Sequence, residues 1–252
     1  MQFHAELADM AKAPTEFCFL NASNPIVVGE TEDDGQAKGK VLKILGSGPS
    51  GGTPLCRVLN GIHVKIKQMA PELRERGQKV SLTIFTDGKA SDGNLQAVMQ
   101  KFAHLPVWVV IRLCTNDDDV GDYWSGIDDN IELEMDVLDD LAGEAREVAK
   151  VNPWLTYGQP LHYLRESGCK VKVLDKLDEA RLMPSEIHVT CPVVLGGTVD
   201  DYVHPDLDMG AFKASIETML NRTPQVWDPI ARRLAPWIKT SKIGGGGCCT
   251  IA

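Results

Sequence analysis

The amino-acid sequence predicts an α/β fold, a mostly parallel sheet covered by helices on both faces. The runs Lys79–Thr86 and Leu105–Leu113 are rich in apolar residues, as strands buried on both faces are, and amphipathic helical patterns alternate with them. The chain has 252 residues and 43% hydrophobic character, enough for a sizeable core.

The first quarter of the chain contains weaker patterns. Apolar residues at helical spacing predict a helix from Gln2 to Lys12, which Ala13-Pro14 ends. Strands are expected at Glu16–Leu20 and Ile26–Val28, and residues 29–39 resemble an exposed loop.

A long amphipathic helix is predicted from Pro54 to Arg76, with Pro54 in the first turn, where a missing N–H costs little. The alternation then continues to residue 150. Helices are predicted near residues 94–103, 118–127 and 138–150, and a further strand at Ile131–Met135.

The charge is acidic and unevenly distributed. The chain has 26 Lys and Arg against 35 Asp and Glu, a net charge of −9, which argues against nucleic acid as a partner. Twelve of the acids lie between Asp117 and Glu144, where no Lys or Arg occurs. Asn116–Asp122 resembles a calcium loop but lacks the EF-hand order, so a solvated acidic face is favoured over docking of a basic partner.

Seven cysteines without zinc-ligand or CxxC spacing indicate a reducing compartment. No apolar stretch is long enough to span a bilayer, and the first residues lack the order of a signal peptide. These observations predict a cytoplasmic protein.

A glycine-rich segment, Gly46–Thr53, precedes the long helix. It matches a phosphate-binding loop except that Gly52 replaces the lysine that contacts the outer phosphates, which weakens the nucleotide interpretation. A glycine-rich connection with no ligand is the second alternative.

The third alternative is a family resemblance. Gly51-Gly52-Thr53-Pro54-Leu55 opens a helix, and an apolar strand about 30 residues later ends in Thr86-Asp87-Gly88. This order resembles the von Willebrand factor type A (vWA) domain over residues 1–190. The resemblance implies that Thr53 and Asp87 are ligands in a metal-ion-dependent adhesion site, which holds Mg²⁺, or Mn²⁺ or Ca²⁺, and takes an Asp or Glu of a protein partner.

The sequence departs from the family pattern at one point. The family's Asp-x-Ser-x-Ser motif does not occur, and the chain opens with what would be the first helix, so the first central strand and three of the five site residues are missing. We therefore expect a gap in the sheet and a partial site in which metal binding is weak or absent.

The C-terminal residues predict lipid attachment. Cys249-Thr250-Ile251-Ala252 fits the prenylation pattern, with Ala252 predicting farnesyl, and Cys248 is a candidate for palmitoylation. We therefore expect a C-terminal extension over 191–243, a flexible tail over 244–252, and peripheral contact with the cytoplasmic face of a membrane.

The extension contains five apolar residues at helical spacing, with basic residues nearby, as an interfacial helix has. Pro229 and Pro236 interrupt that helix, so packing against the domain is favoured. The apolar residues are Trp227, Ile230, Leu234, Trp237 and Ile238.

The sequence as a whole predicts a non-catalytic protein-interaction module of vWA type, tethered to a membrane by a lipid. The alternative is an α/β enzyme, hydrolase-like or nucleotide-binding, with its site at the same carboxyl edge of the sheet.

Overall fold

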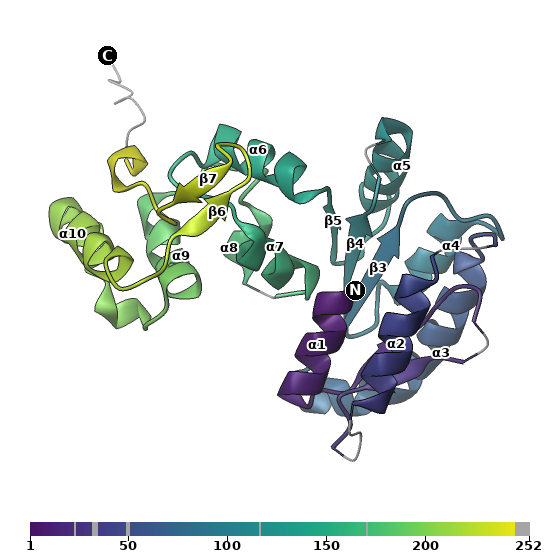
Figure 1. The fold of residues 1–252 in the computed structure, drawn as a ribbon. Coiled ribbons are helices and arrows are strands. Elements are labelled where there is room, and N and C mark those ends of the chain that lie inside the picture. Colours follow the sequence, from purple (N-terminus) through teal and green to yellow (C-terminus); the bar gives the residue numbers. More distant parts are fainter. Residues whose placement is uncertain (23, 32–34, 49–50, 116, 170, 245–252) are drawn as a thin grey trace. The chain divides into compact units, whose positions relative to one another are not determined.

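The computed structural model describes residues 1–252 except 23, 32–34, 49–50, 116, 170 and 245–252. The chain divides into two compact units, Met1–Val137 and Leu138–Ala252, which are described separately (Figure 1). The predicted boundary after residue 190 falls within helix α9, Pro184–Leu195, of the second unit.

The first unit is built on a three-stranded parallel sheet in the order β3-β4-β5, with bounds Val80–Thr86, Val107–Leu113 and Met135–Leu138. Strand β3 pairs with β4 from Val80↔Val107 to Thr86↔Leu113. The central strand β4 is the most deeply buried, as its continuous apolar sequence requires.

Helices flank this sheet, so the predicted α/β class is confirmed (Figure 1). They are α3, Leu55–Glu75; α4, Leu95–Met99, which continues into the 3₁₀ turn Gln100–Phe102; and α5, Asp118–Asp128. Their apolar faces meet the sheet in one core. It includes Leu59, Ile66, Met99, Phe102, Ile111 and Trp124.

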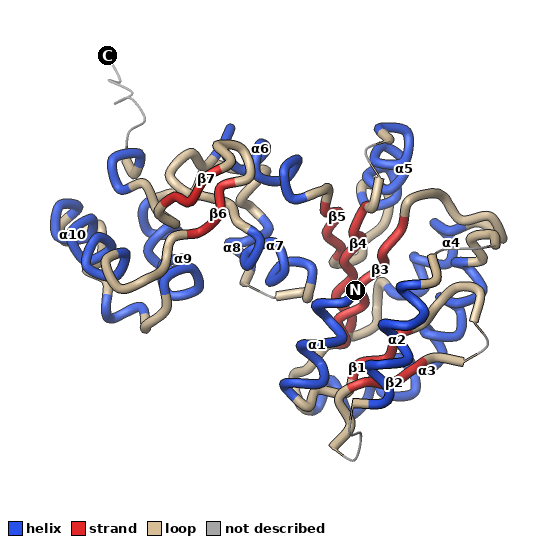
Figure 2. The backbone as a smooth tube through the Cα atoms, in the orientation of Figure 1, coloured by secondary structure: helices blue, strands red, loops and turns tan. Residues whose placement is uncertain are grey.

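A smaller layer forms from the first 46 residues. Strands β1, Thr15–Phe17, and β2, Ile26–Val28, pair antiparallel as a separate two-stranded sheet. Helices α1, Gln2–Ala11, and α2, Gln36–Gly46, pack with it around a core of their own (Figure 2). Among the described residues, no strand joins the two sheets.

Three sequence predictions in this unit were wrong in position. The strand expected at Glu16–Leu20 forms at Thr15–Phe17. Residues 29–39 are not a loop throughout, because α2 begins at Gln36. The strand predicted at Ile131–Met135 forms at Met135–Leu138 instead. Ile131 and Leu133 are buried in the core without belonging to a strand, since alternating apolar residues report burial and not backbone pairing.

The second unit is helical apart from one hairpin. Its core surrounds Trp154, Leu174, Leu177, Phe212 and Ile216. The helices are α6, Leu141–Val151; α7, Gln159–Glu166; α8, Lys172–Asp175; α9; and α10, Met209–Leu220, with 3₁₀ turns at Val199–Asp201 and Thr240–Lys242. The hairpin consists of β6, Val226–Asp228, and β7, Arg233–Ala235.

The hairpin replaces the helical pattern noted at Trp227–Ile238. Pro229 and Pro236 lie at its turn and directly after β7, positions that proline tolerates, whereas a helix would lose a hydrogen bond at each. None of the helices that the structure describes combines the length and apolar character that crossing a bilayer requires.

Candidate functional site

The glycine-rich loop before α3 is held by a distant side chain. The Asn21 amide nitrogen donates to the carbonyl oxygen of Gly52 at 3.0 Å. Gly51 has φ +89°, and a Cβ there would lie 2.9 Å from the Asn21 amide nitrogen. Glycine at this position therefore allows the loop to turn and to approach Asn21 closely.

Two hydrogen bonds join this loop to the loop that follows β3. The backbone N–H of Thr53 donates to Ser91 Oγ at 3.1 Å, and the N–H of Ser91 donates to the carbonyl oxygen of Thr53 at 3.0 Å. The segments that carry Thr53 and Asp87 therefore adjoin at the carboxyl end of β3, the edge where ligands gather in parallel sheets.

Asp92 in the same loop caps helix α3. Its carboxylate accepts from the N–H groups of Cys56 at 2.9 Å and Arg57 at 2.8 Å. Pro54, the residue before the helix, makes no side-chain cap, so Asp92 satisfies N–H groups that would otherwise lack a partner. Burial acts to raise the pKa of Asp92, but the N–H groups of Arg57 and Cys56 outweigh it and hold the pKa below its usual value.

Asp87 lies in a turn fixed by its neighbours. Thr86 Oγ1 accepts from the N–H of Gly88 at 3.2 Å and donates to its carbonyl oxygen at 3.0 Å, and Trp124 Nε1 donates to the same carbonyl at 3.2 Å. Asp87 itself is exposed. The turn thus presents the Asp87 carboxylate to solvent.

The donor set at this edge suits a hard cation but is small. Thr53 and Asp87 offer a hydroxyl and a carboxylate oxygen, the chemistry that Mg²⁺ prefers, yet Mg²⁺ takes six oxygen ligands. Asp92, the nearest other acid in the loop, already holds the start of α3. Water and a partner would have to supply the remaining ligands.

The structure groups three other acids in the second unit, which the sequence did not single out as a set. Glu144 and Glu147 on α6 and Asp178 after α8 have carboxylate oxygens within 4.8 Å of one another. Among the described residues, this is the one group of three or more potential ligands close enough to share an ion.

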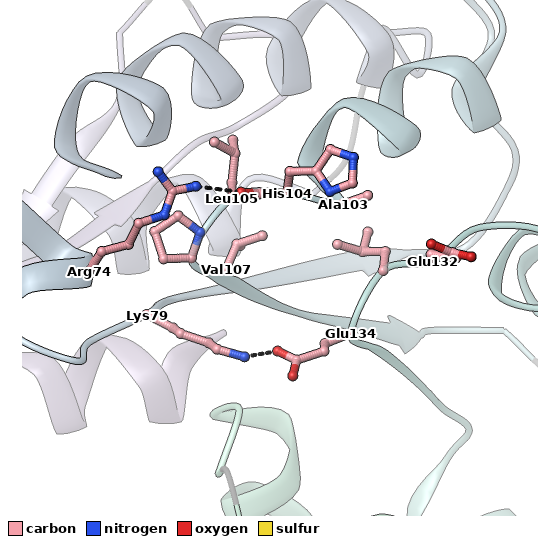
Figure 3. A pocket seen from close by; sticks show the side chains of 10 residues that line it. Arg74, Lys79, Ala103, His104, Leu105, Val107, Glu132 and Glu134 are labelled. Carbon is pink, nitrogen blue, oxygen red and sulfur yellow. Dashed lines mark hydrogen bonds and ion pairs between the residues drawn. The ribbon is translucent and has the colours of Figure 1, made fainter. Parts of the chain in front are cut away.

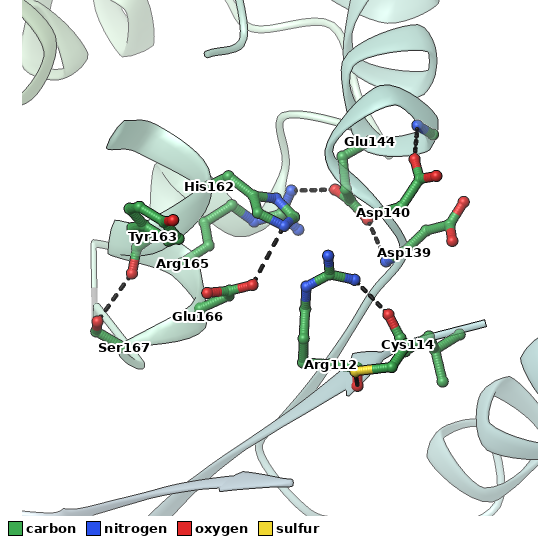
Figure 4. A network of polar contacts seen from close by, with 12 residues as sticks. Arg112, Cys114, Asp139, Asp140, Glu144, His162, Tyr163, Arg165, Glu166 and Ser167 are labelled. Atoms are coloured by element: carbon green, nitrogen blue, oxygen red, sulfur yellow. Dashed lines mark hydrogen bonds and ion pairs between the residues drawn. The ribbon is translucent and has the colours of Figure 1, made fainter. Parts of the chain in front are cut away.

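A guanidinium group already supplies positive charge to this cluster. Arg165 on α7 donates to Glu144 at 2.7 Å (Figure 4). It also donates to Asp178 at 3.0 Å. Arg165 and Glu144 are only 3% and 1% exposed. The arrangement is therefore a buried ion network that links helices, and a metal ion would compete with Arg165 for the same carboxylates.

A histidine extends the polar network along α7. His162 Nδ1 lies 3.2 Å from the Tyr157 hydroxyl. On the other side of the ring, Nε2 lies 3.3 Å from Glu166 Oε1 (Figure 4). Tyr157 and Trp154 are both buried and belong to the hydrophobic core of the second unit.

A shallow cavity of about 350 Å³ lies at the opposite, amino end of β3 and β4 (Figure 3). Its charged lining is largely paired within the protein: Arg74 Nη2 donates to the His104 carbonyl oxygen at 2.6 Å, and Lys79 forms an ion pair with Glu134. With two basic and two acidic side chains in the lining, the cavity favours no class of charged ligand.

Cys248 and Cys249, the predicted lipid acceptors, lie outside the described residues. The fold and site together define an α/β protein with two joined loops at the carboxyl edge of its sheet. No protein-family model, no curated protein and no solved structure matches this chain.

Proposed function

We propose that this chain is a non-catalytic protein-interaction module of vWA type, in which Thr53 and Asp87 form part of a metal-ion-dependent adhesion site. The observation that supports this proposal is the pair of hydrogen bonds between Thr53 and Ser91, which brings the two ligand-bearing loops together. A lipid on Cys249 would hold the module at the cytoplasmic face of a membrane.

The chemistry of binding follows from the small donor set. A Mg²⁺, Mn²⁺ or Ca²⁺ ion at Thr53 and Asp87 would keep most of its waters and leave a position for a carboxylate of the partner. With two ligands from the chain, the ion would bind weakly until the partner's Asp or Glu completes the coordination.

Calorimetric titration of the purified chain with Mg²⁺ and with Mn²⁺ tests the site. We expect weak binding, in the millimolar range or above, that is lost in Asp87→Asn and in Thr53→Ala. The Thr53 substitution keeps both hydrogen bonds to Ser91, because these use the Thr53 backbone.

Asp119→Asn is the matched control. It removes one exposed acid from helix α5, outside the two loops, and so makes the same change in net charge. Binding that is equally strong in wild type, Asp87→Asn and Asp119→Asn would contradict the proposed site.

Metabolic labelling with a farnesyl analogue tests the lipid attachment. We expect label in the wild type and in Cys248→Ser, and none in Cys249→Ser, because the transferase acts on the fourth-last residue. Equal label in wild type and Cys249→Ser would show that the anchor is not there.

A further inference from the structure

The β6–β7 hairpin has one buried face and one apolar face open to solvent. Trp227 and Leu234 are directly opposite each other across the two strands and are 50% and 60% exposed. Val226, Asp228 and Ala235 are buried on the hairpin's other face. Because side chains of a strand alternate between faces, burying one face places Trp227 and Leu234 together on the other.

The buried face is tightly joined to the second unit. A Cβ on Gly158 would lie 2.2 Å from Val226 Cγ2, so the hairpin packs where only glycine leaves room. The N–H of Thr156 donates to the Trp237 carbonyl oxygen at 2.8 Å, and the N–H of Lys239 donates to the Trp154 carbonyl oxygen at 2.7 Å. The packing against Gly158 and these hydrogen bonds therefore fix the position of the hairpin, and of its exposed apolar face, on the second unit.

The turn of the hairpin adds a third exposed apolar residue and two cations. Asp228 Oδ1 accepts from the N–H groups of Ile230 at 2.9 Å and Ala231 at 3.0 Å, which fixes the turn. Ile230 is 50% exposed, Arg232 is exposed in the turn, and Arg233 is exposed at the start of β7, opposite Asp228. Arg232 has φ +53°, so the turn places a residue other than glycine in the left-handed region, which glycine adopts more easily.

The stretch of sequence that contains the hairpin is basic, in contrast to the whole chain. Residues 218–252 contain five Lys and Arg but one acid, Asp228, in a protein of net charge −9. Asp228 is buried, lies 3.8 Å from Lys239 and is the cross-strand neighbour of Arg233, whereas Arg232 lies in the turn.

We propose that this hairpin docks on a membrane surface that carries anionic lipids. Trp227, Leu234 and Ile230 would enter the boundary between headgroups and acyl chains, where tryptophan is favoured. Arg232 and Arg233 would contact lipid phosphates, which guanidinium groups bind through paired hydrogen bonds. Exposed apolar residues with neighbouring cations suit a surface that combines acyl chains with negatively charged headgroups.

This inference deepens the membrane attachment in the proposed function, because Cys249 follows Leu234 by 15 residues. One lipid chain by itself holds a protein only marginally, and a basic apolar surface supplies the second contact that stable attachment needs.

Vesicle flotation of a chain that cannot be lipidated tests the docking surface. The chain carries Cys248→Ser and Cys249→Ser, and the vesicles are phosphatidylcholine alone or with about one third phosphatidylserine. We expect binding to the phosphatidylserine vesicles that weakens with added salt, since exposed charges are screened.

Substitutions in the hairpin should reduce this binding. We expect a decrease of about fivefold for each of Arg232→Gln and Arg233→Gln, and of about tenfold for Trp227→Ala combined with Leu234→Ala. Arg181→Gln and Leu207→Ala are matched controls on exposed residues of the same unit, Leu207 being 83% exposed, and should leave binding unchanged.

Three results would overturn the proposal: no flotation with phosphatidylserine, equal flotation with both vesicles, or flotation that the hairpin substitutions do not change. Self-association that Trp227→Ala and Leu234→Ala abolish, without any vesicle binding, would assign the surface to a second copy of the chain and also overturn it. None of these results would affect the farnesyl labelling of Cys249, so the two proposals fail independently.

Discussion

At the scale of single residues, the role of each carboxylate depends on its hydrogen-bond partners. Asp87 and Asp92 lie five residues apart in one loop, yet Asp87 is exposed at a turn while Asp92 caps helix α3. Ser91-Asp92-Gly93 contains the residue types that are common in turns and helix caps. The helix that Asp92 caps, however, begins at Leu55, 37 residues earlier in the sequence. Local patterns could not connect the two.

The cysteines differ sharply in their environments. Burial raises the pKa of Cys191 to about 12 and, with the Glu16 hydrogen bond, raises the pKa of Cys18 to about 11. Cys114 is exposed. Because the thiolate is the reactive form, the Cys18 and Cys191 thiols should be inert at neutral pH.

Alkylation with iodoacetamide, followed by peptide mass spectrometry, checks this expectation. Among these three residues, Cys114 should react first at pH 8, and Cys191 only after unfolding. A raised pKa keeps the folded thiol protonated, so the Cys191 contribution to stability is complete below its ordinary pKa of 9.0 and is lost as pH rises toward about 12. Rapid labelling of Cys191 in the folded chain at pH 8 would show that the site opens.

At the scale of helices and strands, the sequence patterns that correctly predicted an element are the long ones. The helices predicted at 54–76 and 118–127 and the strand predicted at 79–86 are confirmed, because each has an apolar face or run that decides its burial. Short segments were determined by contacts with other parts of the chain and not by their own pattern. Strand β5 begins four residues later than predicted, and β6 and β7 form within a pattern of helical spacing.

The buried ion network ties α6 to α7 and predicts a large effect of one substitution. Arg165→Met removes the guanidinium that Glu144 and Asp178 accept from, and leaves the buried Glu144 carboxylate without this cation. We expect a loss of about 3–5 kcal/mol in the free energy of unfolding, measured with urea and far-ultraviolet circular dichroism.

Lys150→Met removes a positive charge from an exposed position on the same helix α6 and serves as the control, with an expected change within about 0.5 kcal/mol. The double substitution Glu144→Gln with Arg165→Met should be less destabilising than the two single effects added. Additive effects, or equal effects of Arg165→Met and Lys150→Met, would show that the network does not act as a unit.

At the scale of the whole molecule, the charge is segregated along the chain. The acidic segment Asp117–Glu144 spans the junction between the two units, whereas residues 218–252 are basic. On the proposed function, the basic hairpin would contact an anionic membrane, which an acidic segment would not, because like charges repel.

Sequence alone determined the α/β alternation, the helix and strand at the carboxyl edge, and the prenylation pattern at Cys249. These features depend on local periodicity or on a short contiguous motif. The likeness of the Thr53 and Asp87 segments to a vWA site is likewise a property of the sequence, and the hydrogen bonds to Ser91 show that the segments meet.

Only the tertiary structure decided which carboxylate caps α3, which acids surround Arg165, and that residues 226–235 form a hairpin with Trp227 and Leu234 exposed. Each depends on groups distant along the chain: Asp92 with Cys56, Glu144 with Asp178, and Gly158 with Val226. The physical reason is that burial and partner choice arise from packing between segments, which no local periodicity encodes.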